Sequence, residues 1–432
     1  EHLSVVAYGM HTGAGLGQER TTPQAETSYQ EIERMIQTYH EKSAVTFTGY
    51  KNALETRDEL LQRSGLLLSR GDKKASFYHF TFQDFLAGRR LADIERERLF
   101  DVFCERAEIK EWRNTLSFLF SSELANSREQ ATRLLNRLIE RLTPDSVGLA
   151  VVAADCVETM LCRENRLRPD VEDRFKGICL AAIDNEVEVK ARNTLGLALG
   201  HLGDPRVVDD LRELSVYVEV PADEYAYQDG KQTIDQPFLL AKYLVTNSQF
   251  TLFVTDGGYS DRTHWSKEGW EWKEKENIVE PAYWRDARRN APNQPVVGAS
   301  FYEAEAFSRW AGAFLPTEQQ WEAAARGTEG LEYPWGNEWK DGICNSHEAG
   351  LGKSSTVGLF PRSRSQGFGL EDMGGNVWEW CNSLYHPDQE WRVLRGGSFD
   401  DFARGVRSAY RNDYHPDGRD NVVGFRLART YS

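Results

Sequence analysis

The sequence predicts a multidomain protein in which an all-α N-terminal half precedes an α+β domain with much irregular structure. Its 432 residues are enough for two to four domains. Of the 12 tryptophans, Trp112 alone lies before residue 260, so the composition changes between the two halves. Apolar residues recur at helical spacing in the first half, whereas the second half is aromatic, glycine-rich and rich in loops.

Composition narrows the classes of partner. The net charge of −15 disfavours nucleic acid, because phosphate contacts need clustered lysine and arginine. No apolar run is long enough to cross a membrane, and the first residues lack the pattern of a signal peptide. The six cysteines are scattered without a CxxC pair or a zinc pattern. We therefore expect reduced, mostly buried thiols and a cytoplasmic location.

Residues 1–98 are predicted to contain a winged-helix-like region. The stretch "AETSYQEIERMIQTYH" predicts a helix, and "GLLLSRGDKKASFYHF" predicts a β-hairpin around a polar Gly-Asp turn. Another helix should begin in "TFQDFLAGRRLA", where Thr81 and Asp84 have the spacing of a capping box. The run "SGLLLSRGDKKASFYHFTFQDFLAGRRLA" resembles the winged-helix region that follows the nucleotide-binding core in NACHT (STAND) signalling ATPases. A DNA-binding wing is the alternative, which the acidic balance of the chain disfavours.

The NACHT resemblance implies an ATPase core upstream, and we expect no nucleotide site in this chain. The stretch "GLGKSS" resembles a phosphate loop, but His347 occupies the place of its first glycine. Residues 99–215 are predicted to be helical. Within them, "EVEVKARNTLGLALGHLGDPRVVDDL" resembles one HEAT-type repeat, and a plain helical linker domain is the alternative.

Residues 216–432 are predicted to carry the function. The stretch "AKYLVTNSQFTLFV" should begin as a strand and continue as a helix, and "SFYEAEAFSRWAG" has apolar residues at helical spacing. A further helix should have Thr317 as its N-cap, Gln320 as the partner in a capping box, and Gly327 as its C-cap.

A series of motifs in this region resembles the formylglycine-generating enzyme (sulfatase-modifying factor) family. In order they are "KYLVTNSQF", "QPVVGASFYEAEAFSRW", "LPTEQQWEAAARG", "YPWGNEW", "GLEDMGGNVWEWC", "RVLRGGSF", "RSAYRN" and "VGFR". The resemblance implies a C-type-lectin-like fold with two helices, a small twisted antiparallel sheet and long loops. Members of the family include copper oxidases, iron-dependent sulfoxide synthases and non-catalytic binding proteins, so the family alone does not settle the function.

The sequence lacks the metal-ligand patterns of both enzyme classes. The oxidases bind copper through two cysteines in the segment after "RGGS", and residues 399–426 contain no cysteine. The histidines show none of the spacings of the iron site, and no Ser/His/Asp or GxSxG pattern is present. We therefore expect no copper, no iron and no catalysis. A metal-dependent oxidase with relocated ligands is one alternative, and a scaffold that recruits partners through its helical half is another.

The segment 399–422 is predicted to be a ligand-recognition surface, because it combines aromatic side chains with acids on a loop-rich scaffold. The predicted contact residues are Phe399, Asp400, Asp401, Phe402, Gly405, Val406, Tyr410, Asp413, Tyr414, Gly418, Asp420 and Val422. The surrounding framework arginines are expected to pair with internal acids or backbone carbonyls; they are Arg395, Arg407, Arg411, Arg419 and Arg426.

The same segment resembles the variable proteins of diversity-generating retroelements, which use this lectin-like fold. In those proteins the framework stays fixed while positions encoded by adenine-rich asparagine codons are mutagenised. "RGGS", "RSA" and "GFR" have the character of such a framework, and the residues between them occupy such positions. The resemblance implies a hypervariable surface for an unknown protein or glycan ligand, coupled to a signalling NTPase. The alternative is a fixed sensor.

The family resemblance also implies a calcium site at the "GNVWEW" turn. Asp372 and Glu379 would bind through carboxylates, and Gly375 and Val377 through carbonyls. The alternative is a cation-free turn held by Asn376 and by the packing of Trp378 and Trp380.

Overall fold

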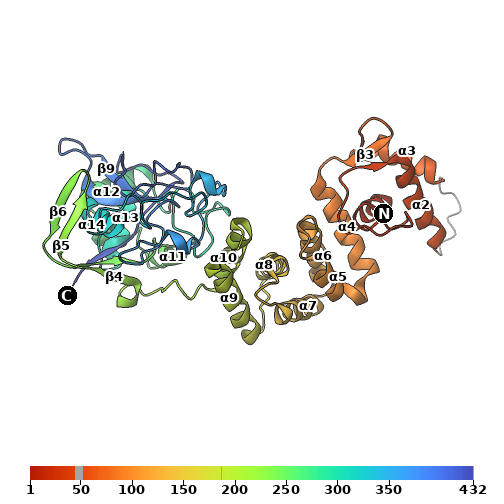
Figure 1. Ribbon diagram of the computed structural model, residues 1–432, viewed down its shortest axis with the longest axis horizontal. Coiled ribbons are helices and arrows are strands. Elements are labelled where there is room, and N and C mark those ends of the chain that lie inside the picture. The colour runs from red at the N-terminus through yellow and green to blue at the C-terminus, as the bar shows by residue number, and fades with distance from the viewer. Residues whose placement is uncertain (44–51, 186, 432) are drawn as a thin grey trace. The chain divides into compact units, whose positions relative to one another are not determined.

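A computed structural model describes residues 1–43, 52–185 and 187–431 of the chain (Figure 1). The chain divides into two compact units, Glu1–Ile178 and Cys179–Ser432. No helix in the described ranges combines the length and the apolar content that a bilayer span requires. All six cysteines are free, and four of them are buried.

The first unit begins with a small three-stranded sheet and its helices. These elements are α1 (His2–Thr12), β1 (Thr27–Ser28), α2 (Tyr29–Lys42), α3 (Ala53–Arg63), β2 (Leu67–Ser69), β3 (Lys74–Phe77) and α4 (Phe80–Ile94). β2 and β3 form the predicted hairpin, and β1 pairs with the other edge of β3. The predicted helix at α2 is confirmed: Ile32, Met35 and Ile36 are buried, and Ser28 and Glu31 form a capping box at its start.

The predicted capping box of Thr81 and Asp84 is wrong. At the start of α4, His79 Nδ1 accepts a hydrogen bond from the Thr81 amide. Asp84 lies inside the helix and is fully buried. Its carboxylate accepts a hydrogen bond from the Thr115 hydroxyl and lies 3.1 Å from His11 Nε2. The Thr-x-x-Asp spacing fits a capping box, and it fits equally well two residues inside a helix. The sequence pattern alone therefore could not distinguish a cap from a buried helical aspartate.

Helices follow α4 in succession. They are α5 (Leu99–Arg106), α6 (Arg113–Asn126), α7 (Arg128–Arg141), α8 (Val147–Leu161), α9 (Pro169–Asp184) and α10 (Val189–Leu202). Short 3₁₀ helices lie at η1 (Arg96–Arg98), η2 (Lys110–Trp112), η3 (Leu214–Val216), η4 (Arg262–His264), η5 (His347–Ala349) and η6 (Pro361–Ser363). Within the first unit, α6 packs against α7 and α8, and each of these helices carries buried apolar side chains, among them Leu119, Leu135 and Val152. The HEAT-type assignment stays a prediction.

The second unit contains small sheets and four helices after α10. The helices are α11 (Asn247–Thr255), α12 (Lys267–Glu276), α13 (Phe301–Trp310) and α14 (Glu318–Arg326). The strands are β4 (Tyr217–Val220), β5 (Asp223–Tyr227), β6 (Gly230–Ile234), β7 (Phe238–Ala241), β8 (Trp378–Leu384), β9 (Arg392–Arg395), β10 (Arg411–Tyr414), β11 (Val423–Gly424) and β12 (Ala428–Thr430). They form a sheet of order β10-β9-β8-β11, a sheet of order β12-β7-β4, and the hairpin β5-β6.

The helix predictions for this unit are confirmed. Thr317 caps α14 with Gln320 in a capping box, and Gly327 follows with a φ of 61°. The strand predicted in "AKYLVTNSQFTLFV" lies earlier, because β7 ends at Ala241, and α11 begins only after Thr246. The small sheets and long loops agree with the lectin-like architecture that the family resemblance implied, but the unit has four helices after α10, where the resemblance implied two.

The core of the second unit is built from aromatic side chains on both sides of the four-stranded sheet. One cluster packs Phe250, Phe307 and Phe425 together, and its rings lie 5.2 to 6.4 Å apart between centroids. The other cluster places Trp321 of α14 beside Val393 of β9. Each face of the four-stranded sheet is therefore packed against a hydrophobic cluster. This packing fixes the orientation of the sheet and of the loops that connect its strands.

Helix α10 packs directly on the loops of this second unit. The Asn293 side chain donates to the Gly196 carbonyl at 3.0 Å and to Asp204 Oδ2 at 2.8 Å. A Cβ atom on Gly200 would lie 2.0 Å from Asn293 Oδ1, so the helix can approach this closely only without a side chain there. The Arg206 guanidinium donates to the Gly358 carbonyl at 3.1 Å. The helix with the clearest HEAT-type pattern therefore belongs to the compact unit that begins at Cys179, whereas the predicted domain begins at residue 216.

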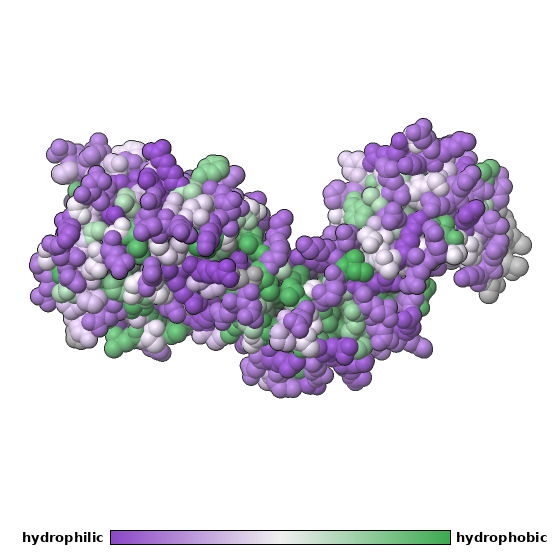
Figure 2. Space-filling view, in the orientation of Figure 1, coloured by the Kyte–Doolittle hydropathy of each residue, from purple (hydrophilic) through white to green (hydrophobic). Residues whose placement is uncertain are grey.

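The surface of both units is mostly hydrophilic in the view of Figure 2, with small hydrophobic patches. Exposed single apolar residues are normal on soluble proteins, so most of these patches need no explanation. Two large exposed side chains, Trp391 and Phe402, lie in or next to the predicted recognition segment.

Candidate functional site

The segment 399–422 leaves the sheet after β9, forms β10 and returns to β11. Gly396 and Gly397 turn the chain with φ values of 93° and 72°, a region that glycine adopts without strain. A Cβ atom on Gly397 would lie 2.7 Å from the Val406 side chain. "RGGS" thus forms a turn that directly follows β9.

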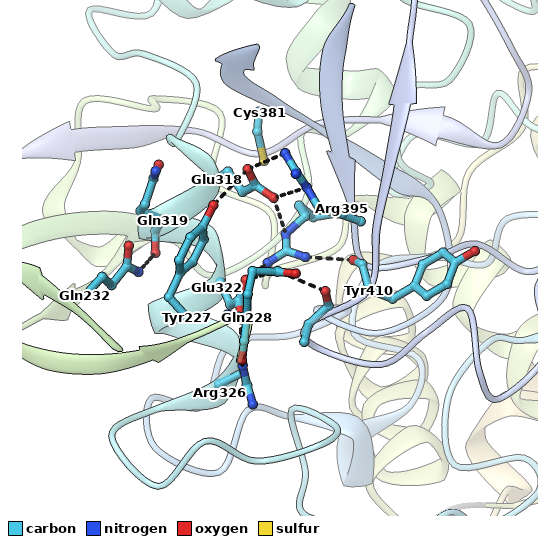
Figure 3. A network of polar contacts seen from close by, with 12 residues as sticks. Tyr227, Gln228, Gln232, Glu318, Gln319, Glu322, Arg326, Cys381, Arg395 and Tyr410 are labelled. Carbon is cyan, nitrogen blue, oxygen red and sulfur yellow. Dashed lines mark hydrogen bonds and ion pairs between the residues drawn. The ribbon is translucent and has the colours of Figure 1, made fainter. Parts of the chain in front are cut away.

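A buried ion-pair network fixes the segment from the α14 side (Figure 3). The Arg395 guanidinium is fully buried, bonds to the Glu322 carboxylate and lies 3.8 Å from Glu318 Oε1. It also donates to the Tyr410 carbonyl at 2.8 Å. Arg411 Nε lies 2.7 Å from the same Glu318 oxygen. Arg395, together with Glu318 and Glu322, thereby holds the main chain at the start of β10.

The β5-β6 hairpin completes this network. The Gln228 side chain donates to Glu322 Oε2 at 2.8 Å and to the Ala409 carbonyl at 3.1 Å, and Arg326 donates to Glu322 Oε1 at 2.8 Å. The Tyr227 hydroxyl donates to Glu318 at 3.2 Å. Figure 3 shows Tyr227 and Gln228 of the hairpin and Arg395 of β9 turned toward the two glutamates of α14.

The other framework arginines are paired as the sequence predicted. Arg426 is fully buried and forms a two-pronged pair with Glu379, at 2.6 and 2.8 Å. Arg419 lies 3.2 Å from the Glu303 carboxylate and donates to the Gly298 carbonyl at 3.2 Å. Arg407 has a looser arrangement, because it lies 3.8 Å from Glu332. The prediction is confirmed for all five arginines.

The Glu303 site shows how burial and pairing compete. Burial raises the pKa of Glu303, whereas Arg419 and the hydrogen bond from the Tyr259 hydroxyl oppose that rise. The Tyr259 hydroxyl donates to Glu303 at 2.6 Å, and burial raises the pKa of Tyr259 well above its usual value. Tyr259 therefore stays protonated and remains a donor.

Most of the predicted contact residues lie at the surface. Exposed or half-exposed are Asp400, Asp401, Phe402, Gly405, Tyr410, Asp413, Tyr414, Gly418, Asp420 and Val422. Phe399 and Val406 are corrections, because both are buried and Val406 packs with Tyr333 and Cys344. A mixed run of apolar and polar residues does not reveal which apolar side chain the loop turns inward.

Some of the exposed residues have internal roles. Asp401 Oδ2 accepts hydrogen bonds from the Ser398 amide at 2.9 Å and from its hydroxyl at 2.6 Å, which closes the turn. A Cβ atom on Gly418 would lie 2.3 Å from Cε1 of Tyr414, so the glycine lets the ring lie against the backbone. These residues support the shape of the segment.

The strand β10 separates the predicted contact residues onto two faces of the sheet. Side chains alternate along a strand, and Arg411 turns toward Glu318 of α14. Tyr414 turns the opposite way, where its ring stacks on Trp380 at 5.9 Å. Asp413 shares the face of Arg411, so it does not join Tyr414 in one surface.

Both ends of the segment are held by the start of β8. The Phe399 amide donates to the Asn376 carbonyl at 3.0 Å, and the Trp378 amide donates to the Val422 carbonyl at 2.8 Å. The Tyr410 ring lies 6.1 Å from the Trp378 ring. The start, the middle and the end of the segment therefore lie around one tryptophan.

His347 and Glu348 belong to the site, although the sequence did not indicate them. The His347 ring packs on the exposed Phe402 ring at 4.2 Å, and the His347 amide donates to the Asp401 carbonyl at 2.9 Å. Glu348 Oε1 accepts from the Ala403 amide at 3.0 Å. These contacts join positions more than fifty residues apart, for which a single sequence carries no signal.

The predicted calcium ligands do not all fit a cation site in this structure. Both oxygens of Glu379 are bonded to Arg426, and Asp372 Oδ2 accepts from the Gly358 amide at 2.7 Å. Burial raises the pKa of Asp372 to about 7. The turn is instead held by Asn376, whose Oδ1 accepts from the Ser355 amide at 2.9 Å. The arrangement favours the cation-free alternative, and calcium stays a prediction.

The nearest cysteines to the segment are buried thiols. Burial raises the pKa of both Cys344 and Cys381 well above that of a free thiol, so neither is set up as a thiolate. In the part of the chain that the structure describes, no three side chains of histidine, cysteine, aspartate or glutamate gather as a metal site.

Comparison with known proteins places the second unit. Residues 216–431 match the family described as "Sulfatase-modifying factor enzyme 1-like domain". The chain belongs to this family. The sulfatase-modifying factor domain predicted from the motifs is thereby confirmed.

Two curated relatives of this domain differ in their activities. The chain is 32% identical over 243 residues to the hercynine oxygenase of Mycobacterium tuberculosis, covering 48% of this chain and 57% of that protein. It is 32% identical over 275 residues to the inactive C-alpha-formylglycine-generating enzyme 2 of Mus musculus, covering 54% of this chain and 88% of that protein. The chain thus spans only part of the length of the oxygenase.

Among solved structures, the domain is similar to Treponema denticola variable protein 1. The TM-score is 0.37 at 17% identity, and the match covers 50% of this chain and 95% of that one.

Proposed function

We propose that the sulfatase-modifying factor domain is a non-enzymatic ligand-binding module whose recognition surface is the segment 399–422. The observation that carries this proposal is that, within the segment, the framework arginines hold the backbone while other side chains stay accessible to a ligand. Four of the five framework arginines are engaged by buried acids, while Asp400, Phe402, Tyr410 and Asp420 stay accessible on a fixed backbone. Rigid loops that present aromatic and acidic side chains are typical of binding surfaces.

We further propose that this surface is diversified, as in the variable protein of a diversity-generating retroelement. The structure narrows the positions that can vary freely. Val406 and Phe399 are buried, and Gly418 is constrained by Tyr414, so variation should concentrate at Asp400, Phe402 and the other exposed positions. Sequencing of residues 392–426 across a population tests this, since adenine-confined substitutions at exposed positions support it. A uniform sequence would instead point to a fixed sensor.

An oxidase is the second candidate, and the names of the relatives divide between the two candidates. One of them is a hercynine oxygenase, and another is an inactive formylglycine-generating enzyme. Against catalysis by the copper route, residues 399–426 contain no cysteine, and Cys344 and Cys381 are buried away from the thiolate form. Turnover of hercynine by the protein supplied with iron or with copper would overturn the binding proposal.

The experiment that tests recognition is a screen of the full chain against glycan and peptide arrays. Hits are then measured on a variant with Phe402→Ala and Tyr410→Ala, and on a control with Val279→Ala and Tyr431→Ala, which are exposed apolar residues of the same unit. Loss of binding only in the first variant supports the surface. Equal binding by both variants places recognition elsewhere, as in a scaffold that uses the helical half.

For the first unit we propose a winged helix that couples the surface to a signalling NTPase. The element order α1-β1-α2-α3-β2-β3, with β3 between the other two strands, supports this proposal. α3 carries Glu55, Asp58 and Glu59, which disfavours a DNA-contacting role for this helix. HEAT-like helices would connect the two parts. Co-purification with a nucleotide-binding protein, or nucleotide binding by a longer form of this chain, tests the coupling.

A further inference from the structure

The charge that the segment presents to a partner differs in sign from the charge of its sequence. Residues 392–426 contain seven arginines and five aspartates, so the sequence of this stretch carries a net positive charge. This net charge alone would predict an anionic ligand.

The internal pairing removes most of that positive charge from the surface. Arg395 and Arg426 are fully buried against Glu322 and Glu379. Arg411 and Arg419 are paired with Glu318 and Glu303, and these two acids are also buried. Each pair cancels its own field at short range, so these four arginines offer little attraction to a ligand.

The aspartates Asp400 and Asp420, in contrast, are not neutralised by internal ion pairs. Asp400 is exposed, and no described residue pairs with its carboxylate. The Asp420 carboxylate is half-exposed and accepts one backbone amide, that of Val422, at 3.3 Å.

Three arginines remain outside the buried pairs. Arg404 is exposed with no described acid partner, Arg407 lies 3.8 Å from Glu332 with 38% of its side chain exposed, and Arg392 is half-buried over the Phe301 ring. The five aspartates of the stretch outnumber these three arginines.

The two aspartates flank aromatic side chains on one part of the surface. Asp400 follows Phe399, and Asp420 lies two residues before Val422; those two residues are bonded to Asn376 and Trp378 at the start of β8. The Tyr410 ring lies 6.1 Å from the Trp378 ring, and Phe402, of which 59% is exposed, lies two residues after Asp400 along the chain. Carboxylates beside exposed aromatic rings attract cationic side chains through both charge and cation–π contact.

We propose that the recognition surface around Trp378 binds a protein partner through lysine or arginine side chains of that partner. This inference rests on the proposed recognition function and adds the chemistry of the ligand. Binding should be fast and should weaken as the salt concentration rises, because exposed carboxylates are screened.

The test is selection of a random peptide library on the immobilised full chain. Enrichment of lysine and arginine in the selected peptides is expected. The selected peptides are then measured on the double variant Asp400→Asn with Asp420→Asn, for which we expect a loss of about tenfold in affinity. The control is Asp229→Asn with Asp235→Asn, which removes the same charge from exposed positions of the same unit and should change affinity less than about twofold.

The outcomes separate this inference from the proposed function. Selected peptides without basic residues, or equal losses in both double variants, would overturn the charge inference while leaving recognition intact. Glycan hits that depend on Phe402 and Tyr410, with no peptide selected, would also overturn it. If neither the glycan array nor the peptide array yields a ligand, the proposed recognition function itself is contradicted.

Discussion

Framework arginines and recognition residues alternate along one stretch of chain, yet they live in opposite environments. Arg395 and Arg426 are fully buried, and each is met by a carboxylate from another element. Phe402 is 59% exposed, and Asp400 has no described partner. The comparison teaches that stability and recognition are divided residue by residue in this segment, so each can change without the other.

Breaking the framework should have the largest effect. Arg395→Ala removes the fully buried cation that pairs with Glu322 Oε2 and donates to the Tyr410 carbonyl, and it leaves Arg326 as the remaining cation at Glu322. We expect the free energy of unfolding to fall by about 3–5 kcal/mol, because one partner of a buried ion pair is lost. Arg404→Ala removes the same residue type from an exposed position and should change it by less than about 0.5 kcal/mol. Tryptophan fluorescence during urea unfolding reports on the second unit, because all tryptophans except Trp112 lie in it. Similar losses in both variants would remove the distinction between framework and surface.

The contact of α10 extends the framework beyond the predicted domain. Gly200→Ala places a methyl group against Asn293, and we expect a loss of about 1–3 kcal/mol from overpacking. Gly177→Ala in α9 is the matched control, because no atom lies within reach of its Cβ, and it should stabilise the helix slightly. Thermal unfolding of the two variants decides. A stabilising Gly200→Ala would show that α10 is not closely packed on this unit.

Two positions of the segment should prove to be coupled. Gly418→Ala drives its methyl group into the Tyr414 ring and should cost about 1 kcal/mol. In a Tyr414→Ala background the same change should cost almost nothing, which a double-mutant cycle measures. Gly367→Ala, where the Cβ meets no atom, serves as the control. Additive effects would mean that Gly418 varies independently of its neighbour.

Calcium should have the smallest effect. Because both Glu379 oxygens are bonded to Arg426, we expect added calcium or a chelator to leave the melting temperature almost unchanged. Calorimetry with calcium, with magnesium as the comparison ion, measures this. A clear rise with calcium alone would restore the predicted ligand set and would require Arg426 to release Glu379.

The sequence predicted the parts of the molecule whose physics is local. Thr317, Gln320 and Gly327 mark the ends of α14 because cap residues act on their own helix. The arginine pairs were predictable in kind, since a buried guanidinium needs an acceptor, but their partners came from distant elements. The inward turn of Val406, the His347–Phe402 contact and the packing of α10 depend on tertiary approach. Asp84 shows the converse error, in which a local pattern is overridden by a buried network.

The attachment of the segment at the start of β8 makes it an exchangeable cassette. Its first amide and its last carbonyl are held at Asn376 and Trp378, so a segment that differs only at its exposed positions begins and ends at the same two anchor points. The entropy of closing a loop depends on its length and not on its sequence, so such exchanges leave that cost unchanged. A scaffold of this kind is suited to display engineering: a synthetic library confined to the exposed codons would yield new binders without redesign of the domain that carries them.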